Sequence, residues 1–338
     1  VSSCKPLNFH IMSIFRKALL TLAAAATALA CGAETIDDKV NSLYERMTPG
    51  ERLAQLQSTY MHKFFDAEGR LDTALCRQLI PDGIGHFSQY ASNIHKSPDQ
   101  VRDMVAQIQA WLVSNTPSGI PALPHEEVLT GINTMDATVY PQQIGLACSF
   151  NPELAEKKAW LTATALRKIG GFQALSPMVD VVRDPSFNRL EESYGEDDYL
   201  SAVMGTAFVR GLQHGNLRDG IAACTKHYLG YGGGGDASEK ELVEEILLPH
   251  EAAIRLAGLQ TIMPGYHAVY GVKCVANKYI LQDILHRYLN YDGIVVSDYS
   301  SIEQIDDNLS DVQRAAAALN AGNDVDFPEG KSYAFLPQ

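Results

Sequence analysis

The chain has 338 residues, of which 46% are hydrophobic and 20% are charged, and this ordinary globular composition excludes a disordered or fibrous protein. Its formal net charge of -13 repels phosphate backbones, and no cluster of Lys and Arg interleaved with aromatic residues offsets that charge. We therefore expect no nucleic-acid partner.

The N-terminus has the pattern of an export signal. Arg16 and Lys17 precede the apolar run LLTLAAAATALA, which is too short to span a membrane and ends in small residues before Cys31. We predict that residues 1–30 are an upstream extension and signal peptide, and that residues 31–338 form the mature domain. The protein is then periplasmic or extracellular, either free after cleavage or anchored as a lipoprotein through lipid on Cys31.

The four cysteines that follow Cys31 in the sequence are widely spaced and contain no CxxC pair, so they predict neither a zinc site nor a disulfide scaffold. We expect four mostly buried thiols, at Cys76, Cys148, Cys224 and Cys274.

From residue 83 onward, short apolar runs alternate with amphipathic stretches of helical period. The runs predicted as strands are 83–87, 120–124, 143–150, 174–182, 221–229, 260–264, 293–298 and 324–327. The predicted helices are 98–113, 152–169, 197–213, 239–257, 279–290 and 309–320. Asn151 before Pro152 predicts a helix cap, and Ser238 with Glu241 predicts a capping box.

This alternation predicts an α/β fold with a parallel sheet, either closed as an eightfold barrel or open and doubly wound. About eight runs in roughly 300 residues favour the closed (β/α)8 TIM-like barrel. We expect the chain to end near the last barrel helix, before that helix is complete.

Polar side chains gather after the predicted strands. In a barrel these positions share one rim, where catalytic residues lie. The residues are Glu126, Glu127, Asp180, Arg183, Asp184, Lys226, His227, Tyr266, His267 and Asp298.

Asp298 ends the apolar run GIVVSD and allows two interpretations. An aspartate is a good helix cap, and Ser300, Ser301 and Glu303 follow in the order of a capped first turn. Alternatively, one of the serines caps the helix, and Asp298 faces the barrel mouth as an ionised carboxylate near Arg189, Lys226 and His227.

Several chemistries lack their motifs. The sequence has no HExxH, no dense Asp cluster and no GxSxG, so we expect neither a metal site nor a serine or cysteine nucleophile. Residues 230–235 match GxGxxG, with Glu251 at a distance suited to a ribose hydroxyl, but Asp236 and Ala237 separate the glycines from the helix start. We therefore expect no dinucleotide cofactor. A carboxylate nucleophile among hydrogen-bonding groups remains, an arrangement used on sugars.

Six ordered segments resemble the N-terminal barrel domain of glycoside hydrolase family 3. The resemblance covers nearly all of residues 36–330, and six matches in the right order are far more specific than any single one. The segments are IPALPHEEVLTG (120–131), VRDPSFNRLEESYGED (182–197), CTKHYLGYG (224–232), MPGYHAVYG (263–271), YDGIVVSDYSSI (291–302) and LNAGNDVDFP (319–328).

The resemblance implies an exo-acting retaining β-glycosidase without a cofactor, which hydrolyses terminal β-D-glucosyl residues of oligosaccharides or glycosides. Asp298 corresponds to the nucleophile that forms a covalent glycosyl-enzyme. Arg189, Lys226, His227 and Tyr266 match residues around the sugar, and Glu127 matches an acid that holds its far hydroxyls.

Three departures from the family pattern bear on the substrate. Glu127 stands where aspartate is common and Tyr299 where tryptophan is common, while Phe187 and Asn188 replace a frequent Trp-Gly pair. The longer acid at 127 occupies space that a C6 hydroxymethyl group needs. A β-xylosidase is therefore the alternative activity.

The resemblance also implies where the catalytic acid of the reaction is to be expected. The loop GGGGDASEK lacks the histidine that serves as the acid in the N-acetylglucosaminidase branch, which disfavours that branch. In the glucosidase and xylosidase branches the acid is a glutamate of a second, sandwich domain. We expect it from such a domain or from a second chain; otherwise the protein is a catalytically incomplete, sugar-binding barrel fragment.

Overall fold

A computed structural model describes residues 35–337, so the predicted extension, signal peptide and Cys31 lie outside the described residues. The chain divides into two compact units at Met47. The described part of the first unit is helix α2 (Ile36–Arg46), which Thr35 and Asp38 begin with a capping box. The second unit starts at Thr48 and contains the sheet.

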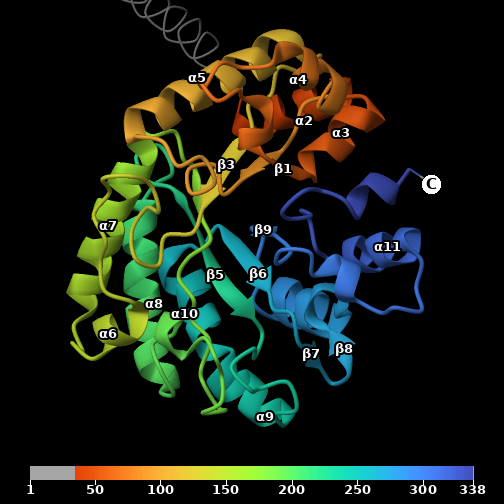
Figure 1. The fold of residues 1–338 in the computed structure, drawn as a ribbon. Helices are drawn as coiled ribbons and strands as arrows, with labels where there is room; N and C mark the ends of the chain where they lie inside the picture. Colours follow the sequence, from red (N-terminus) through yellow and green to blue (C-terminus); the bar gives the residue numbers. More distant parts are fainter. Residues whose placement is uncertain (1–34, 338) are drawn as a thin grey trace, which may run out of the picture. The chain divides into compact units, whose positions relative to one another are not determined.

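Within the described residues, seven parallel strands pair in chain order to form the centre of the second unit (Figure 1). They are β1 (Ser58–Tyr60), β2 (His86–Ser88), β3 (Leu123–Glu126), β4 (Gln173–Ala174), β5 (Ala222–Tyr228), β6 (Thr261–Pro264) and β9 (Ile294–Val295). Because every pair is parallel, all the strands end at the same mouth.

Residues 324–326 close the sheet into a ring. Val325 bridges Val296 beyond β9, and Asp326 bridges Gln57 before β1, both in parallel orientation. The backbone N–H of Ser297 donates to the Val325 carbonyl at 2.9 Å, and that of Asp326 donates to the Leu56 carbonyl at 2.9 Å. The predicted TIM-like barrel is therefore confirmed, with the predicted run 324–327 in the eighth position.

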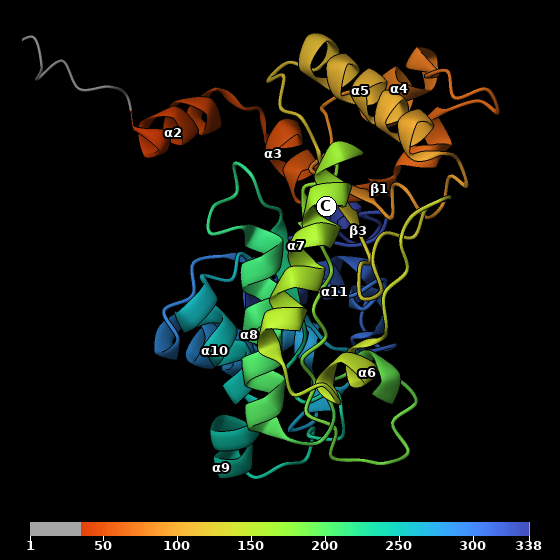
Figure 2. The ribbon, with the colours of Figure 1, turned by 90° about the vertical axis from the view of Figure 1, so that its left-hand side faces the viewer.

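Helices connect the strands and cover the outside of the barrel (Figures 1 and 2). They are α3 (Pro49–Gln55), η1 (Met61–Phe64), α4 (Thr73–Leu79), α5 (Pro98–Asn115), α6 (Gln143–Ala147), α7 (Pro152–Lys168), η2 (Leu190–Glu192), α8 (Asp198–Gln213), α9 (Glu239–Glu241), η3 (Leu242–Ile246), α10 (Leu248–Ala257), η4 (Cys274–Ala276), η5 (Tyr279–Tyr288), η6 (Ile302–Gln304), α11 (Asp311–Ala321) and η7 (Tyr333–Phe335). A short antiparallel hairpin, β7 (Ala268–Val269) with β8 (Val272–Lys273), follows β6.

The predicted helix starts are confirmed. Asn151 accepts a hydrogen bond from the Leu154 amide with Pro152 at the first position of α7, and Ser238 and Glu241 form a reciprocal capping box at α9. All six helical stretches predicted from periodicity are helical over most of their length.

One predicted strand is a helix and one observed strand was not predicted, so the number of barrel positions still agrees with the prediction. Residues 143–150 contain helix α6, whose buried positions Gln143, Leu146 and Ala147 follow a spacing of three and four instead of the alternation of a strand. Strand β1 was missed because Ser-Thr-Tyr is short and has no apolar run.

Apolar side chains fill the barrel and the space between barrel and helices. Leu175, Cys224, Met263, Val296 and Phe327 form a buried cluster within the ring of strands. Of the four cysteines expected to be mostly buried, Cys76, Cys224 and Cys274 are buried and Cys148 is exposed. Among residues 35–337, no helix combines the length and apolar character needed to cross a bilayer.

Helices α7 and α8 lie side by side (Figure 2), and Gly211 of α8 makes their close approach possible. A Cβ at Gly211 would lie 2.2 Å from the Glu156 carbonyl oxygen and 2.7 Å from the Ala159 Cβ. Gly145 of α6 is exposed, and its nearest such contact is Pro141 Cβ at 3.7 Å. The two positions are a matched pair of helical glycines.

We expect Gly211→Ala to lower the free energy of unfolding by about 1–3 kcal/mol, because a methyl group at this position forces the two helices apart. Gly145→Ala is the control, and we expect it to stabilise the protein by up to about 1 kcal/mol, since alanine favours a helix. Chemical denaturation of both variants measures the difference, and equal stabilities would contradict this packing.

Candidate active site

Asp298 lies at the mouth of the barrel, three residues beyond β9, and is 7% exposed. Its Oδ1 accepts a 2.7 Å hydrogen bond from the Tyr299 amide. Within residues 35–337, its Oδ2 is buried and accepts no hydrogen bond, and it lies 3.4 Å from Nε2 of His227. One carboxylate oxygen is therefore fixed by the backbone, while the other has no donor.

Asp298 does not cap a helix. The turn after it, η6, begins at Ile302, and Ser301 stands at the capping position without a side-chain capping bond. The predicted serine cap was wrong as well, because only a short turn follows the strand and the next helix, α11, begins at Asp311 with Ser310 as its cap. Asp298 thus has no structural role as a cap.

The His227 ring lies between Asp298 and the buried carboxylate of Asp180. Its Nδ1–H donates to Asp180 Oδ2 at 2.7 Å, and Nη1 of Arg189 donates to its Nε2 at 3.1 Å. This assignment uses both ring nitrogens of a neutral imidazole. Burial lowers the pKa of His227 to about 3, and burial raises the pKa of Asp180 to about 6. Because Nε2 is an acceptor, His227 cannot donate a hydrogen bond to Asp298.

Arg189 is held by a carboxylate in the same turn of chain. Its Nε and Nη2 donate to the two oxygens of Glu192 at 2.8 and 2.7 Å, in a bidentate pair. Although burial acts in the opposite direction, the Arg189 guanidinium holds the pKa of Glu192 below its ordinary value. The guanidinium is therefore fixed in position by Glu192 before any ligand binds.

Lys226 and Glu127 form an ion pair across the mouth. Nζ of Lys226, from buried strand β5, lies 2.6 and 2.7 Å from the two oxygens of Glu127, which follows β3. The Lys226 side chain is 3% exposed, whereas that of Glu127 is 36% exposed and reaches the cleft. This pair presents one acidic and one basic group to the same space.

Tyr266, after β6, completes the ring of predicted residues. Its hydroxyl donates to the Tyr299 carbonyl at 2.9 Å. Burial, and then the neighbouring Asp298 charge, raise the pKa of the Tyr266 phenol. Tyr299 is fixed in turn by a 2.8 Å hydrogen bond between its hydroxyl and Nε2 of His125. The residue after Asp298 is therefore held at both its carbonyl and its side chain.

Not every strand-end residue belongs to this site. Glu126 points into the wall, Arg183 pairs with Glu241 and Glu245, and Asp184 accepts hydrogen bonds from Ser186. The structure brings together Glu127, Arg189, Lys226, His227, Tyr266 and Asp298, the six residues singled out by the sequence.

Three further residues contact these six and were not assigned to the site from the sequence. Asp180 fixes the His227 ring and Glu192 fixes Arg189. The Tyr231 ring packs edge-on against His227 with centroids 4.9 Å apart and lies 6.0 Å from the Arg189 guanidinium carbon. Asp180 ends a predicted strand and Glu192 lies three residues after Arg189, so these two had a local signal, whereas Tyr231 was hidden within the glycine run.

The glycine run has a packing role. A Cβ at Gly232 would lie 2.5 Å from the Val181 carbonyl oxygen, and one at Gly233 would lie 2.9 Å from Asp184 Cβ. The helix begins only at Glu239, after the Ser238 cap. The glycines therefore allow residues 230–235 to press against the segment after β4, which carries Asp180, and they do not form the start of a phosphate-binding helix.

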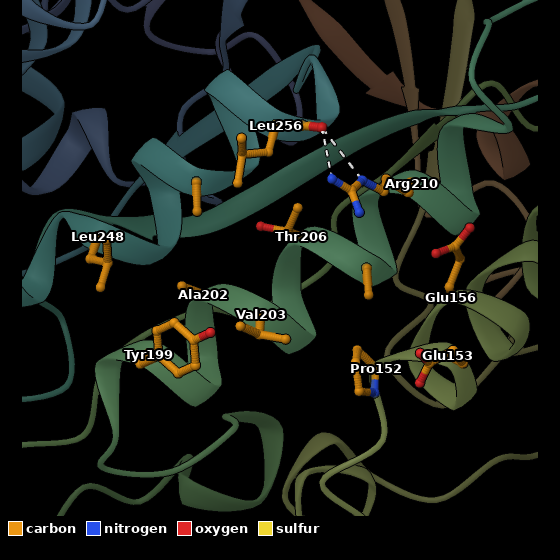
Figure 3. Close-up of a pocket in the computed structure, with 12 residues that line it drawn as sticks. Pro152, Glu153, Glu156, Tyr199, Ala202, Val203, Thr206, Arg210, Leu248 and Leu256 are labelled. Carbon is orange, nitrogen blue, oxygen red and sulfur yellow. Dashed lines mark hydrogen bonds between the residues drawn. The ribbon is translucent and has the colours of Figure 1, made fainter.

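A cleft of about 600 Å³ opens beside these residues. Polar and apolar groups both line it, and the lining residues are Glu127, Leu129, Thr130, Gly131, Ile132, Asn133, Thr134, Val139, Gln142, Arg189, Glu191 and Glu192. A second hollow of about 380 Å³ lies between α7, α8 and α10, where Arg210 donates to the Leu256 carbonyl (Figure 3). None of the strand-end residues lines that hollow, so the candidate active site is the cleft at the mouth.

The described residues offer no metal centre, since no three His, Cys, Asp or Glu side chains among residues 35–337 gather at ligand distance. What the mouth offers is an unpaired carboxylate oxygen facing fixed donors and acceptors. That arrangement suits nucleophilic attack on a substrate rich in hydroxyl groups.

Comparison with known proteins identifies the family to which the sequence is similar. Residues 48–336 match the family model for the Glycosyl hydrolase family 3 N terminal domain. The chain is 35% identical over 254 residues to a β-xylosidase of Formosa agariphila, covering 68% of this chain and 35% of that protein. It is 27% identical to a periplasmic β-glucosidase of Salmonella typhimurium, covering 90% of this chain and 39% of the relative.

A solved structure gives the same result for the fold. A β-glucosidase from Erythrobacter marinus superposes with a TM-score of 0.82 at 29% identity, covering 89% of this chain and 42% of the other. The chain thus spans about two fifths of the length of the proteins that it resembles.

We expect the His227 ring to stay neutral, with its proton on Nδ1, from pH 8 down to pH 5. Burial lowers its pKa to about 3, whereas a histidine in an unfolded chain titrates near 6.5. Ring-nitrogen NMR with labelled histidine measures the protonation state, and His227→Asn assigns the signal. A His227 titration midpoint above pH 6 would show that the ring carries a charge beside Asp298.

Proposed function

Because the chain belongs to glycosyl hydrolase family 3, we propose that its barrel bears the nucleophile of an exo-acting, retaining β-glycosidase. The substrates are oligosaccharides or glycosides, from which terminal, non-reducing β-D-glucosyl residues are removed. The observation that carries the proposal is Oδ2 of Asp298, a buried carboxylate oxygen without a hydrogen-bond donor among the described residues. Asp298 attacks the anomeric carbon, and water later hydrolyses the covalent glycosyl-enzyme with overall retention.

The charged residues at the mouth bind the sugar. Arg189 and Lys226 donate hydrogen bonds to sugar hydroxyls, and Glu127 accepts them at the end of the ring far from Asp298. Strands β3 and β9 are the third and seventh of the eight positions around the ring, so Glu127 and Asp298 stand on opposite sides of the mouth. A sugar placed with its anomeric carbon at Asp298 therefore extends toward Glu127. His227 accepts from a hydroxyl or from Arg189, and Tyr266 lies beside the nucleophile.

The carboxyl groups of Glu127, Glu192 and Asp180, which share the mouth with Asp298, are unsuited to the role of general acid. Both oxygens of Glu127 are engaged by Lys226, and both oxygens of Glu192 are engaged by Arg189. Asp180 is held by the backbone and ring of buried His227. We therefore propose that the acid comes from outside this chain, either from a sandwich domain or from a second subunit. No cofactor takes part in the proposed reaction.

β-Xylosidase is the second candidate activity. Glu127 places its carboxylate one methylene farther into the site than an aspartate does, and its pair with Lys226 fixes it there. A xyloside lacks the C6 hydroxymethyl group that would meet this carboxylate. The relative from Formosa agariphila, a β-xylosidase, adds to the case for xylosides.

We propose the periplasm or the cell exterior as the site of action. The export pattern of residues 1–30 supports this proposal, and residues 31–338 then form the exported barrel domain. The relative from Salmonella typhimurium is a periplasmic enzyme. A lipid on Cys31 would hold the same domain at a membrane surface.

Labelling with an activated fluorosugar tests the nucleophile. We expect 2,4-dinitrophenyl 2-deoxy-2-fluoro-β-D-glucoside or its xyloside analogue to modify Asp298, because its leaving group needs no acid and the fluorine slows hydrolysis of the adduct. Mass spectrometry of peptides from the longest available chain locates the label, and Asp298→Asn is the control. A label on a different residue would remove Asp298 from its proposed role.

Substrate preference tests Glu127. We expect Glu127→Asp to shift the ratio of kcat/KM for aryl β-D-glucosides over aryl β-D-xylosides toward glucosides by about 10-fold or more, because the shorter acid makes room for C6. The wild type and the Glu127→Asp variant are both assayed as the longest available chain with aryl glycosides. An unchanged ratio would show that the length of the acid at 127 does not select the sugar.

A chain that is labelled at Asp298 but does not hydrolyse aryl glycosides would correspond to the barrel without its acid. In that case the sugar-binding part of the proposal stands, and turnover requires the second domain or subunit. Turnover by residues 31–338 alone, at a rate comparable to full-length relatives, would instead place the acid within this chain.

A further inference from the structure

The wall of the cleft is a long segment without helix or strand. Residues 128–142, here called the cleft segment, run from the end of β3 to the start of α6, and eight of them line the cleft. Few backbone hydrogen bonds stabilise the segment internally, among them the Tyr140 amide to the Thr130 carbonyl at 2.8 Å. A segment of this kind needs an outside anchor to hold one shape.

Lys158 of α7 contacts both ends of the cleft segment. Its Nζ donates to the Leu129 carbonyl at 2.6 Å, to the Pro141 carbonyl at 2.8 Å and to Oε1 of Gln143 at 3.5 Å. An ammonium group has three N–H donors, and here each donor meets one oxygen. Leu129 and Pro141 are twelve residues apart, so one side chain ties the beginning of the segment to its end.

The burial of this charge is unusual. Lys158 is 5% exposed, and none of the ion pairs among the described residues involves it. The ring of Phe208 lies 5.6 Å from its Nζ. A buried, unpaired charge is costly, and an apolar side chain of the same length would fill the space on α7 at lower cost. Burial lowers the pKa of Lys158 to about 8, so the ammonium form with all three donors is present at neutral pH.

We propose that Lys158 is a positioning residue that fixes the cleft segment, and with it the sugar-binding wall opposite Arg189 and Glu192. The inference rests on the proposed function in one respect, since it takes the ligand of the cleft to be a sugar. Lys158 does not line the cleft, so its effect on binding passes through the backbone at Leu129 and Pro141. Asp298 follows β9, which lies elsewhere in the ring, so its chemistry does not depend on this anchor.

Lys157 provides a matched control. It is the neighbouring residue on α7 and has the same side chain, but it is exposed. Lys158→Met removes the donors while filling a similar volume, and Lys157→Met makes the same change at the surface. Lys158→Gln supplies an amide with two N–H donors that lie one bond closer to the backbone than Nζ, so it tests for partial rescue and serves in place of Lys158→Met if that variant does not fold.

Hydrogen exchange followed by mass spectrometry measures how strongly Lys158 holds the cleft segment, and it needs no substrate. We expect Lys158→Met to accelerate amide exchange in residues 128–142 by at least 10-fold, with the strands of the barrel unchanged, and Lys158→Gln to lie between it and the wild type. Lys157→Met should match the wild type. The inference would be overturned if the cleft segment of Lys158→Met exchanged at the wild-type rate, or if Lys157→Met accelerated its exchange equally.

Inactivation by the activated fluorosugar measures the effect of the Lys158 anchor on sugar binding. In the longest available chain, we expect Lys158→Met to raise the concentration for half-maximal inactivation by at least 5-fold, while the limiting rate constant stays within twofold. A fall in the limiting rate alone would contradict a positioning role. If the wild type itself is not labelled at Asp298, the proposed function fails, and the exchange result still decides whether Lys158 anchors the segment.

Discussion

The backbone hydrogen bonds that close the ring of strands are the interaction on which the whole site depends. Residues 324–326 pair on one side with the chain beyond β9 and on the other side with the chain before β1. Closure places the ends of strands that are far apart in sequence around one mouth. Glu127 and Lys226 lie 99 residues apart in sequence, yet their side chains form a direct ion pair. An open sheet would separate its first and last strands and leave Asp298 without a surrounding wall.

Closure of the ring of strands brings charged side chains together at the mouth, and ion pairs and hydrogen bonds offset the cost of burying them. Several charged side chains are brought into a small, partly dry space, and each unpaired charge there is costly. Lys226 is matched by Glu127, Arg189 by Glu192, and the neutral ring of His227 by Asp180. After these pairings, the donors near Asp298 are already engaged, and its Oδ2 accepts no hydrogen bond from residues 35–337. The same pairings that stabilise the folded mouth therefore leave one carboxylate oxygen without a donor among these residues, which is the oxygen that the proposed function uses.

Much of this arrangement could be predicted from the sequence, and the exceptions have physical causes. Helices α7 and α8 are long enough to show a clear helical periodicity of apolar residues and clear capping residues, so their bounds were predicted well. Strand β1 has three polar or aromatic residues and gives no apolar signal, while the helical spacing in 143–150 was obscured by its short length. The six site residues follow strands or known motifs. Lys158 was not predictable, because an anchor formed with backbone carbonyls leaves no pattern in the side-chain sequence.

The adjacent acids Glu126 and Glu127 divide two tasks between neighbouring positions. Glu126 is buried and accepts hydrogen bonds from the Ala91 amide and from the amide and hydroxyl of Ser92, which joins the loop after β2 to the end of β3. Glu127 turns the other way, toward the cleft. The anchoring of the loop thus depends on one residue, and the acidic group that faces the cleft is supplied by the next. Under the proposed function, a mutation at position 127 changes the group that meets the sugar, while Glu126 still holds the loop after β2 in place.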